Sequence, residues 1–82
     1  MRRIGSPKEL SVVLKDKRRM KKLNQKHIAE LSGMRQATIS DLECDSSGAK
    51  IETLFKVATA LGLDIYLTNK KTPVDNSDSE LW

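Results

Sequence analysis

Small and apolar residues between Ala29 and Leu42 follow a spacing that only a few folds can accommodate. Three residues separate Ala29 from Gly33, five separate Gly33 from Ile39, and two separate Ile39 from Leu42. A small residue at Ala29 allows two helices to cross closely, and Gly33 permits the left-handed backbone of a sharp turn between them. The spacing therefore predicts two short helices that cross at a steep angle, with Ile39 and Leu42 locking the pair.

A capping box marks the start of an earlier helix. Ser6 precedes Pro7, which is a favourable first helical residue, and Glu9 follows three residues after Ser6. Apolar side chains then recur at helical spacing. We expect this first helix over residues 7–21.

Further start and stop signals predict three more helices. Asn24 is the expected N-cap of the second helix, which Gly33 ends. A third helix is expected over residues 36–43 and a fourth over residues 51–61, although Lys50 is a poor cap for the fourth. The apolar face of the second helix is formed by Ile28, Ala29 and Leu31.

Residues 63–69 change the period of the pattern. Ile65 and Leu67 fall on one side of this segment, and Tyr66 and Thr68 fall on the other, which is typical of a strand. A lone strand leaves its backbone groups without hydrogen-bonding partners, and no second strand is visible in the chain. The pattern therefore predicts that the strand pairs with its own copy in a homodimer.

The predicted fold class is all-α, with four or five helices and one C-terminal β-strand that pairs across the homodimer. Residues 1–69 would form the folded and dimerising domain, and the polar residues 70–82 would be a flexible tail. Leu81 and Trp82 end this tail, and a tryptophan is costly to leave in water. Docking to a partner protein is the favoured explanation, while a degradation signal and the absence of any role remain alternatives.

Composition excludes several classes of function. The chain holds one cysteine and one histidine, so it cannot form an intrachain disulfide, and the residue spacing of a four-ligand zinc site is absent. No apolar run approaches the ~20 residues of a membrane span, and no signal peptide is present, so we expect a cytoplasmic protein without a membrane partner. There is no glycine-rich phosphate loop and no set of nucleophile and base. We therefore predict no catalytic residue, no metal and no cofactor.

Basic residues concentrate at the start of the chain. Residues 1–22 hold nine lysines and arginines against Glu9 and Asp16, a net charge of +7, whereas the whole chain carries +4. A local basic patch favours a polyanionic partner, with nucleic acid first among the candidates. A solvated helix face explains the charge equally well.

The third predicted helix presents a polar and nearly uncharged face once its apolar residues are assigned to the core. The side chains left on that face are Gln36, Ala37, Thr38 and Ser40. In a major groove, glutamine can bond an adenine edge at two atoms, and the methyl groups of Ala37 and Thr38 can contact a thymine methyl. The face therefore suits base edges of double-stranded DNA, although it could also be a solvated surface.

These features resemble the phage-repressor type of helix-turn-helix protein. The resemblance is carried by LNQKHIAELSGMRQATISDLE (residues 23–43) and KIETLFKVATALGL (residues 50–63). A narrower resemblance, to HipB-like antitoxins, rests on QATIS (residues 36–40), the strand over residues 64–69 and the final Trp82.

The resemblance implies a transcriptional autorepressor that acts as the antitoxin of a type II toxin–antitoxin system. Its implied partners are a near-palindromic operator in double-stranded DNA, a second copy of the chain and a HipA-like kinase toxin. A solitary phage-type or chromosomal repressor without a toxin is the alternative.

The resemblance also implies roles for individual residues. Gln25 corresponds to the family's phosphate-contacting glutamine, Lys26 would add a phosphate contact, and Arg35 would contact bases or adjoining phosphates. The positions that match the family's base-reading side chains are Gln36, Ala37, Thr38 and Ser40.

Outside the expected DNA contact, one further position matches the family pattern and two depart from it. Arg18 corresponds to an internal arginine of the first helix, whose role there is structural. Lys22 stands where a glycine often closes the first helix, so we expect a looser turn. Asp41 departs from the pattern because phosphate repels a carboxylate, so we expect it to turn aside and to stay out of the DNA contact.

Overall fold

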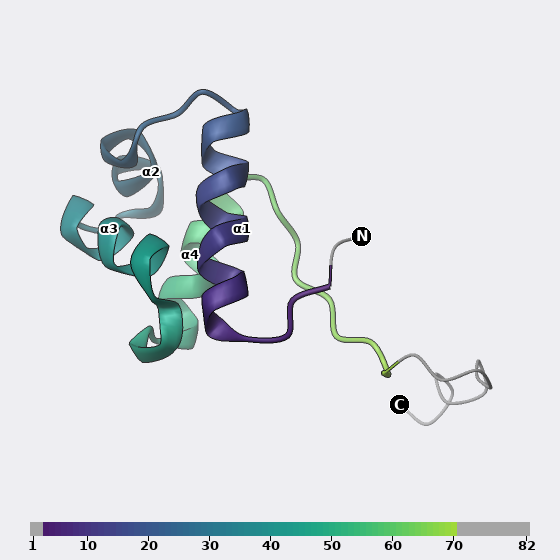
Figure 1. Ribbon diagram of the computed structural model, residues 1–82. Coiled ribbons are helices and arrows are strands. Elements are labelled where there is room, and N and C mark those ends of the chain that lie inside the picture. Colours follow the sequence, from purple (N-terminus) through teal and green to yellow (C-terminus); the bar gives the residue numbers. More distant parts are fainter. Residues whose placement is uncertain (1–2, 71–82) are drawn as a thin grey trace.

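The computed structural model describes residues 3–70, which form four α-helices and one short 3₁₀ turn (Figure 1). The elements are α1 (Pro7–Met20), α2 (Gln25–Ser32), α3 (Gln36–Cys44), η1 (Ser46–Gly48) and α4 (Ile51–Ala60). The four predicted helices are confirmed to within one residue at each end. The predicted tail over residues 70–82, including Leu81 and Trp82, lies outside the described residues apart from Lys70.

Local side-chain caps explain where the first two helices begin. The Ser6 hydroxyl accepts a hydrogen bond of 3.1 Å from the backbone N–H of Glu9. The Asn24 side-chain oxygen accepts one of 2.8 Å from the N–H of His27. Lys50, the predicted poor cap, makes no side-chain capping bond at the start of α4. The first turn of α4 therefore depends on packing rather than on a cap.

Three helices end in the same hydrogen-bonded turn, whose central residue adopts left-handed backbone. That residue is Gly33 after α2, with φ of 71°, and Gly62 after α4, with φ of 73°. After α1 it is Lys22, with φ of 58°, the one non-glycine residue with positive φ within residues 3–70. The N–H of Leu23 donates to the Arg18 carbonyl across this turn at 3.2 Å. The expectation of a looser turn is therefore wrong, because lysine adopts the strained conformation that glycine would enter freely.

The apolar core lies where the four helices meet. Its buried residues are Leu14, Ile28, Ala29, Ile39, Leu42, Val57 and Leu61. α3 packs against both α1 and α2, and α4 packs against α2. Burial of Ala29 together with Ile39 and Leu42 agrees with the predicted close crossing of α2 and α3. The crossing leaves one side of α3 facing outward from the helical body (Figure 1).

Leu31 is a correction to the predicted apolar face of α2. Its side chain is 58% exposed, although Ile28 and Ala29 are buried. At 100° per residue, Leu31 lies about 110° from the direction midway between those two residues. α3 and α4 cover that direction, so Leu31 falls at the edge of the buried stripe, beside Phe55 of α4.

Residues 63–70 leave the helical body after Gly62 and extend away from it (Figure 1). They form no regular secondary structure in the single chain, so the strand predicted over residues 63–69 is not formed by one protomer alone. The four side chains assigned to that strand are all exposed: Ile65, Tyr66, Leu67 and Thr68. A strand requires a neighbour, and a single chain does not supply one. Pairing with a second copy therefore stays a prediction.

Candidate nucleic-acid interface

The outer side of α3 carries the residues predicted to read bases. Gln36 and Ala37 are exposed, and Thr38 and Ser40 are half-buried. Ile39 and Leu42, on the opposite side of the helix, are buried in the core. α3 therefore presents short, polar or methyl-bearing side chains to whatever lies outside it, with Arg35 exposed immediately before its first residue.

Asp41 shares this outer side, contrary to the expectation that it turns aside. Its side chain is exposed, and its carboxylate makes no hydrogen bond or ion pair within residues 3–70. Helix geometry explains the difference, because Asp41 lies one turn after the outward-facing Ala37 and no basic side chain engages it. A free carboxylate therefore belongs to the candidate interface.

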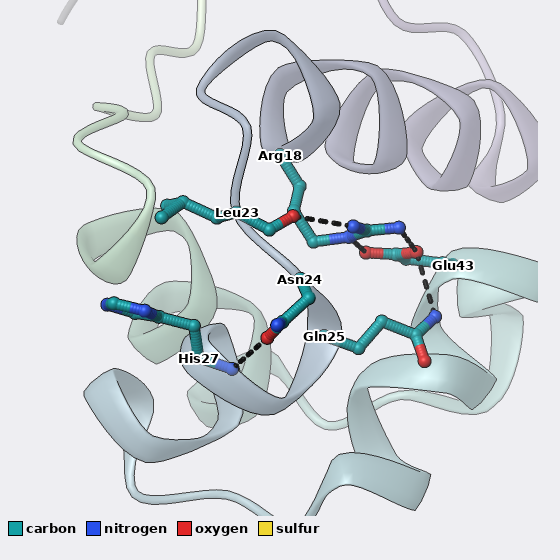
Figure 2. Close-up of polar contacts among 6 residues, drawn as sticks. All are labelled: Arg18, Leu23, Asn24, Gln25, His27 and Glu43. Carbon is teal, nitrogen blue, oxygen red and sulfur yellow. Dashed lines mark hydrogen bonds and ion pairs between the residues drawn. The ribbon is translucent and has the colours of Figure 1, made fainter.

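A largely buried ion pair supports this surface from behind. Arg18 Nε lies 2.6 Å from Oε2 of Glu43, and Arg18 Nη2 donates to Oε1 of Glu43 at 3.0 Å. Arg18 Nη1 also donates to the carbonyl of Leu23 at 2.7 Å. Figure 2 shows that these groups join the end of α1, the connection to α2 and the last turn of α3. Arg18 thus has a structural position of the kind that the resemblance implies.

The ion pair keeps both groups charged. Burial of the Glu43 carboxylate acts to raise its pKa, but hydrogen bonds from Arg18 and Gln25 and the charge of Arg18 outweigh that effect. The pKa of Glu43 therefore lies below its ordinary value. The hydrogen bond to Glu43 raises the pKa of Arg18. Glu43 is thus ionised at neutral pH and accepts hydrogen bonds only.

Gln25 is held by the same carboxylate. Its Nε2 donates to Oε1 of Glu43 at 3.1 Å, which fixes the amide nitrogen, rather than the oxygen, toward Glu43 (Figure 2). The amide nitrogen carries two hydrogens, so one donor is left for another acceptor. Lys26, the next residue, is exposed. The first turn of α2 thus holds one spare amide donor beside a cation, and phosphate contact by Gln25 and Lys26 stays a prediction.

A second polar cluster, unmarked by any sequence motif, attaches η1 to α1. The buried Ser11 hydroxyl accepts a hydrogen bond of 2.8 Å from the N–H of Ser46. Both serine hydroxyls donate to the carbonyl of Pro7, at 3.1 Å and 2.7 Å. Lys8 adds a contact of 3.3 Å to the carbonyl of Cys44, the last residue of α3. The last turn of α3 is therefore held to α1 by this cluster as well as by the Arg18–Glu43 ion pair.

Residues 3–70 contain neither a metal site nor a membrane-spanning helix. The residues described include no group of three or more His, Cys, Asp or Glu side chains arranged to hold a metal ion. Within the same range, no helix has the length and apolar character needed to cross a bilayer.

Comparison with known families identifies this arrangement. The helix-turn-helix family matches residues 14–67, a range that includes all of α2, α3 and α4. The chain belongs to the helix-turn-helix family. In the helix-turn-helix motif of this chain, α2 and α3 are the paired helices. The fold is that of a DNA-binding regulator.

Comparison with solved structures shows which helix-turn-helix proteins this chain resembles in sequence and fold. A chain in a complex of HipA, HipB, O2 and O3 is 31% identical to this one, with a TM-score of 0.83 over 87% of this chain and 100% of that chain. HipB in a complex with an O4 20mer gives the same values. A wild-type restriction-modification controller protein is 26% identical, with a TM-score of 0.68 over 71% of this chain and 75% of that chain. No curated protein matches the sequence. The resemblance to HipB-type proteins is therefore confirmed.

Proposed function

We propose that this chain is a sequence-specific transcriptional autorepressor and the antitoxin of a type II toxin–antitoxin system with a HipA-like kinase toxin. The observation that carries the proposal is the outward, short-chain polar face of α3, fixed to α1 by the Arg18–Glu43 ion pair. The likeness to HipB, which is found in a complex with HipA, O2 and O3, supports the choice of partners. The protein acts in the cytoplasm by binding and without catalysis.

Base reading falls to α3. Gln36 bonds an adenine edge at two atoms, Ala37 and Thr38 present methyl groups to thymine, and Ser40 supplies a hydroxyl that can donate or accept. Exposure of Gln36 and Ala37 and partial exposure of Thr38 and Ser40 support these roles. Side chains this short allow the helix to lie deep in the groove.

Phosphate contacts set the register of α3 on the duplex. The spare N–H of Gln25 and the free backbone N–H groups at the start of α2 are directed donors, and Lys26 and Arg35 add positive charge. Glu43 orients Gln25 and also lies in the last turn of α3. The phosphate contact and the base-reading helix therefore share one support.

Dimerisation uses the segment after α4. Exposed apolar side chains gather there, and Phe55, Ile65 and Tyr66 line a shallow hollow of about 430 Å³ between α4 and residues 63–66. The exposed apolar side chains around this hollow favour its use as an interaction site. Antiparallel pairing of residues 63–69 from two copies would satisfy the strand and cover the hollow. Two α3 helices would then enter successive major grooves about 34 Å apart and read a near-palindrome.

Toxin docking is assigned to the end of the chain. Leu81 and Trp82 lie outside the described residues, and the support is chemical: tryptophan is prominent among interface anchors. Deleting both residues should weaken capture of the co-expressed kinase toxin while leaving operator binding unchanged. Full toxin binding and neutralisation by the truncated chain would refute this assignment.

A solitary repressor without a toxin is the second candidate. The likeness to a restriction-modification controller protein favours it, because that regulator belongs to a different kind of system. The neighbouring open reading frames discriminate between the two. A kinase-like gene beside this one supports the antitoxin, and its absence supports the solitary repressor.

Operator binding is tested with purified protein and duplexes from its own promoter. Replacing Gln36 and Thr38 together with alanine should reduce the preference for operator over random duplex, because readout contacts are lost. The matched control is Lys26→Ala, which should weaken all duplexes alike and lower the slope of log affinity against log salt by about one. Unchanged operator preference in the double variant would contradict base readout by α3.

A further inference from the structure

The outer face of α3 has an unexplained member in Asp41. At 100° per residue, Ala37 lies about 170° from the direction in which Ile39 and Leu42 are buried. Ser40 and Asp41 lie on either side of Ala37, each about 130° from the buried direction. Any duplex that Ala37 and Ser40 reach is therefore also faced by Asp41.

The carboxylate of Asp41 differs sharply from that of Glu43, two residues later. Glu43 has a side chain 6% exposed and receives hydrogen bonds from Arg18 and Gln25. Asp41 is exposed, and within residues 3–70 it has neither a hydrogen bond nor an ion pair. Its acceptor oxygens are thus available to a ligand that offers donors.

The chemistry of base edges restricts what such a group can bind. An ionised carboxylate only accepts hydrogen bonds. In the major groove guanine presents two acceptors and thymine presents an acceptor and a methyl group, whereas cytosine presents its N4 amino group as a donor. Adenine presents its N6 amino group beside the N7 acceptor, and the N7 acceptor repels a carboxylate. Because Ala37 is small, α3 can approach closely enough for a side chain as short as aspartate.

We infer that Asp41 is a specificity-determining residue that accepts a hydrogen bond from the N4 amino group of one cytosine in each operator half-site. The inference rests on the proposed function, since it requires α3 to enter the major groove. The unfavourable charge of Asp41 near phosphate is offset only when this cytosine is present, so the residue rejects other sequences as well as selecting one.

Selection from a duplex pool with randomised half-sites tests the inference. The wild-type protein should select cytosine at one position of each half-site, and replacing that base pair should cost about tenfold or more in affinity. Asp41→Asn should change the preference at that position from cytosine to adenine, because an amide bonds both N6 and N7 of adenine. Asp41→Ala should remove the preference at that position and leave the others intact.

Glu30→Gln is the matched control for losing one negative charge, because Glu30 is exposed on α2 rather than on α3. This variant should keep the cytosine preference. If Asp41→Asn strengthens binding to all duplexes equally and shifts no base preference, Asp41 only repels phosphate and the inference is overturned. If the wild-type protein selects no sequence at all, the proposed function fails with it.

Discussion

Arg18 and Glu43 form an ion pair with 2.6 Å between Nε and Oε2, and it joins α1 to the last turn of α3. Their side chains are only 13% and 6% exposed, so water screens the pair weakly. The same carboxylate holds Gln25 at the start of α2. One group therefore sets the relative positions of the two surfaces assigned to phosphate and to bases.

Glu43→Gln should lower the free energy of unfolding by about 3 kcal/mol, because it leaves the buried guanidinium of Arg18 without a counter-charge. Urea denaturation followed by circular dichroism measures the change. The control is Glu52→Gln, whose partner Lys56 lies 3.9 Å away in an exposed pair, and it should change stability by less than about 0.5 kcal/mol. Equal losses of unfolding free energy in the two variants would show that the Arg18–Glu43 pair stabilises the protein no more than an exposed pair does.

The stability contributed by Glu43 should disappear in acid. Its pKa is lower in the folded chain than in the unfolded chain, so the contribution is complete above the ordinary glutamate pKa of about 4.3 and is lost as pH falls through the folded pKa. Unfolding free energies of the wild type and Glu43→Gln, measured from pH 7 to pH 2, should differ most at neutral pH and converge in acid. A gap that stays constant over this range would contradict the lowered pKa.

Lys22→Gly should stabilise the protein by about 1 kcal/mol, because it relieves left-handed backbone at a residue with φ of 58°. Thermal and urea unfolding measure the gain. Lys22→Ala removes the same charge but keeps the β-carbon, so it should not reproduce the effect. A gain of equal size from alanine would assign the effect to charge rather than to backbone strain.

Leu67→Asp should convert the proposed dimer to a monomer and abolish tight operator binding, because a charge would enter the paired segment. Leu67 is 89% exposed in the single chain and belongs to the predicted strand. Sedimentation equilibrium gives the mass, and gel shifts give the affinity. Met20→Asp is the control, since Met20 is 72% exposed but lies at the end of α1. A monomeric wild-type protein, or a dimeric Leu67→Asp variant, would refute pairing through residues 63–69.

The features that were predictable from sequence depend on neighbouring residues. Ser6 and Asn24 bond backbone groups three residues away, and Gly33 ends α2 through its own backbone freedom. The outward face of α3 follows from the burial of Ile39 and Leu42, which the spacing predicts. Each of these effects spans one helical turn or a single crossing.

The predictions that failed involved surfaces made by distant segments. Leu31 has helical spacing suited to the core, yet it falls at the edge of the stripe that α3 and α4 cover, and it is 58% exposed. Repulsion between phosphate and a carboxylate led us to expect Asp41 to turn aside. Its position on α3 instead directs the side chain outward, and no basic residue within residues 3–70 engages it. The partner of residues 63–69 is a question of assembly, which one copy of the chain does not answer.

Local sequence signals account for the four helices, the capped starts of α1 and α2, the turn at Gly33 and the residues that α3 turns outward, because caps, left-handed glycine and helical period act within a few residues. Tertiary structure alone decided that Glu43 binds Arg18 and Gln25, and that Ser46 binds Ser11. These partners lie 18 to 35 residues apart. No periodic signal connects such positions, and only packing of the apolar core brings them within hydrogen-bonding distance.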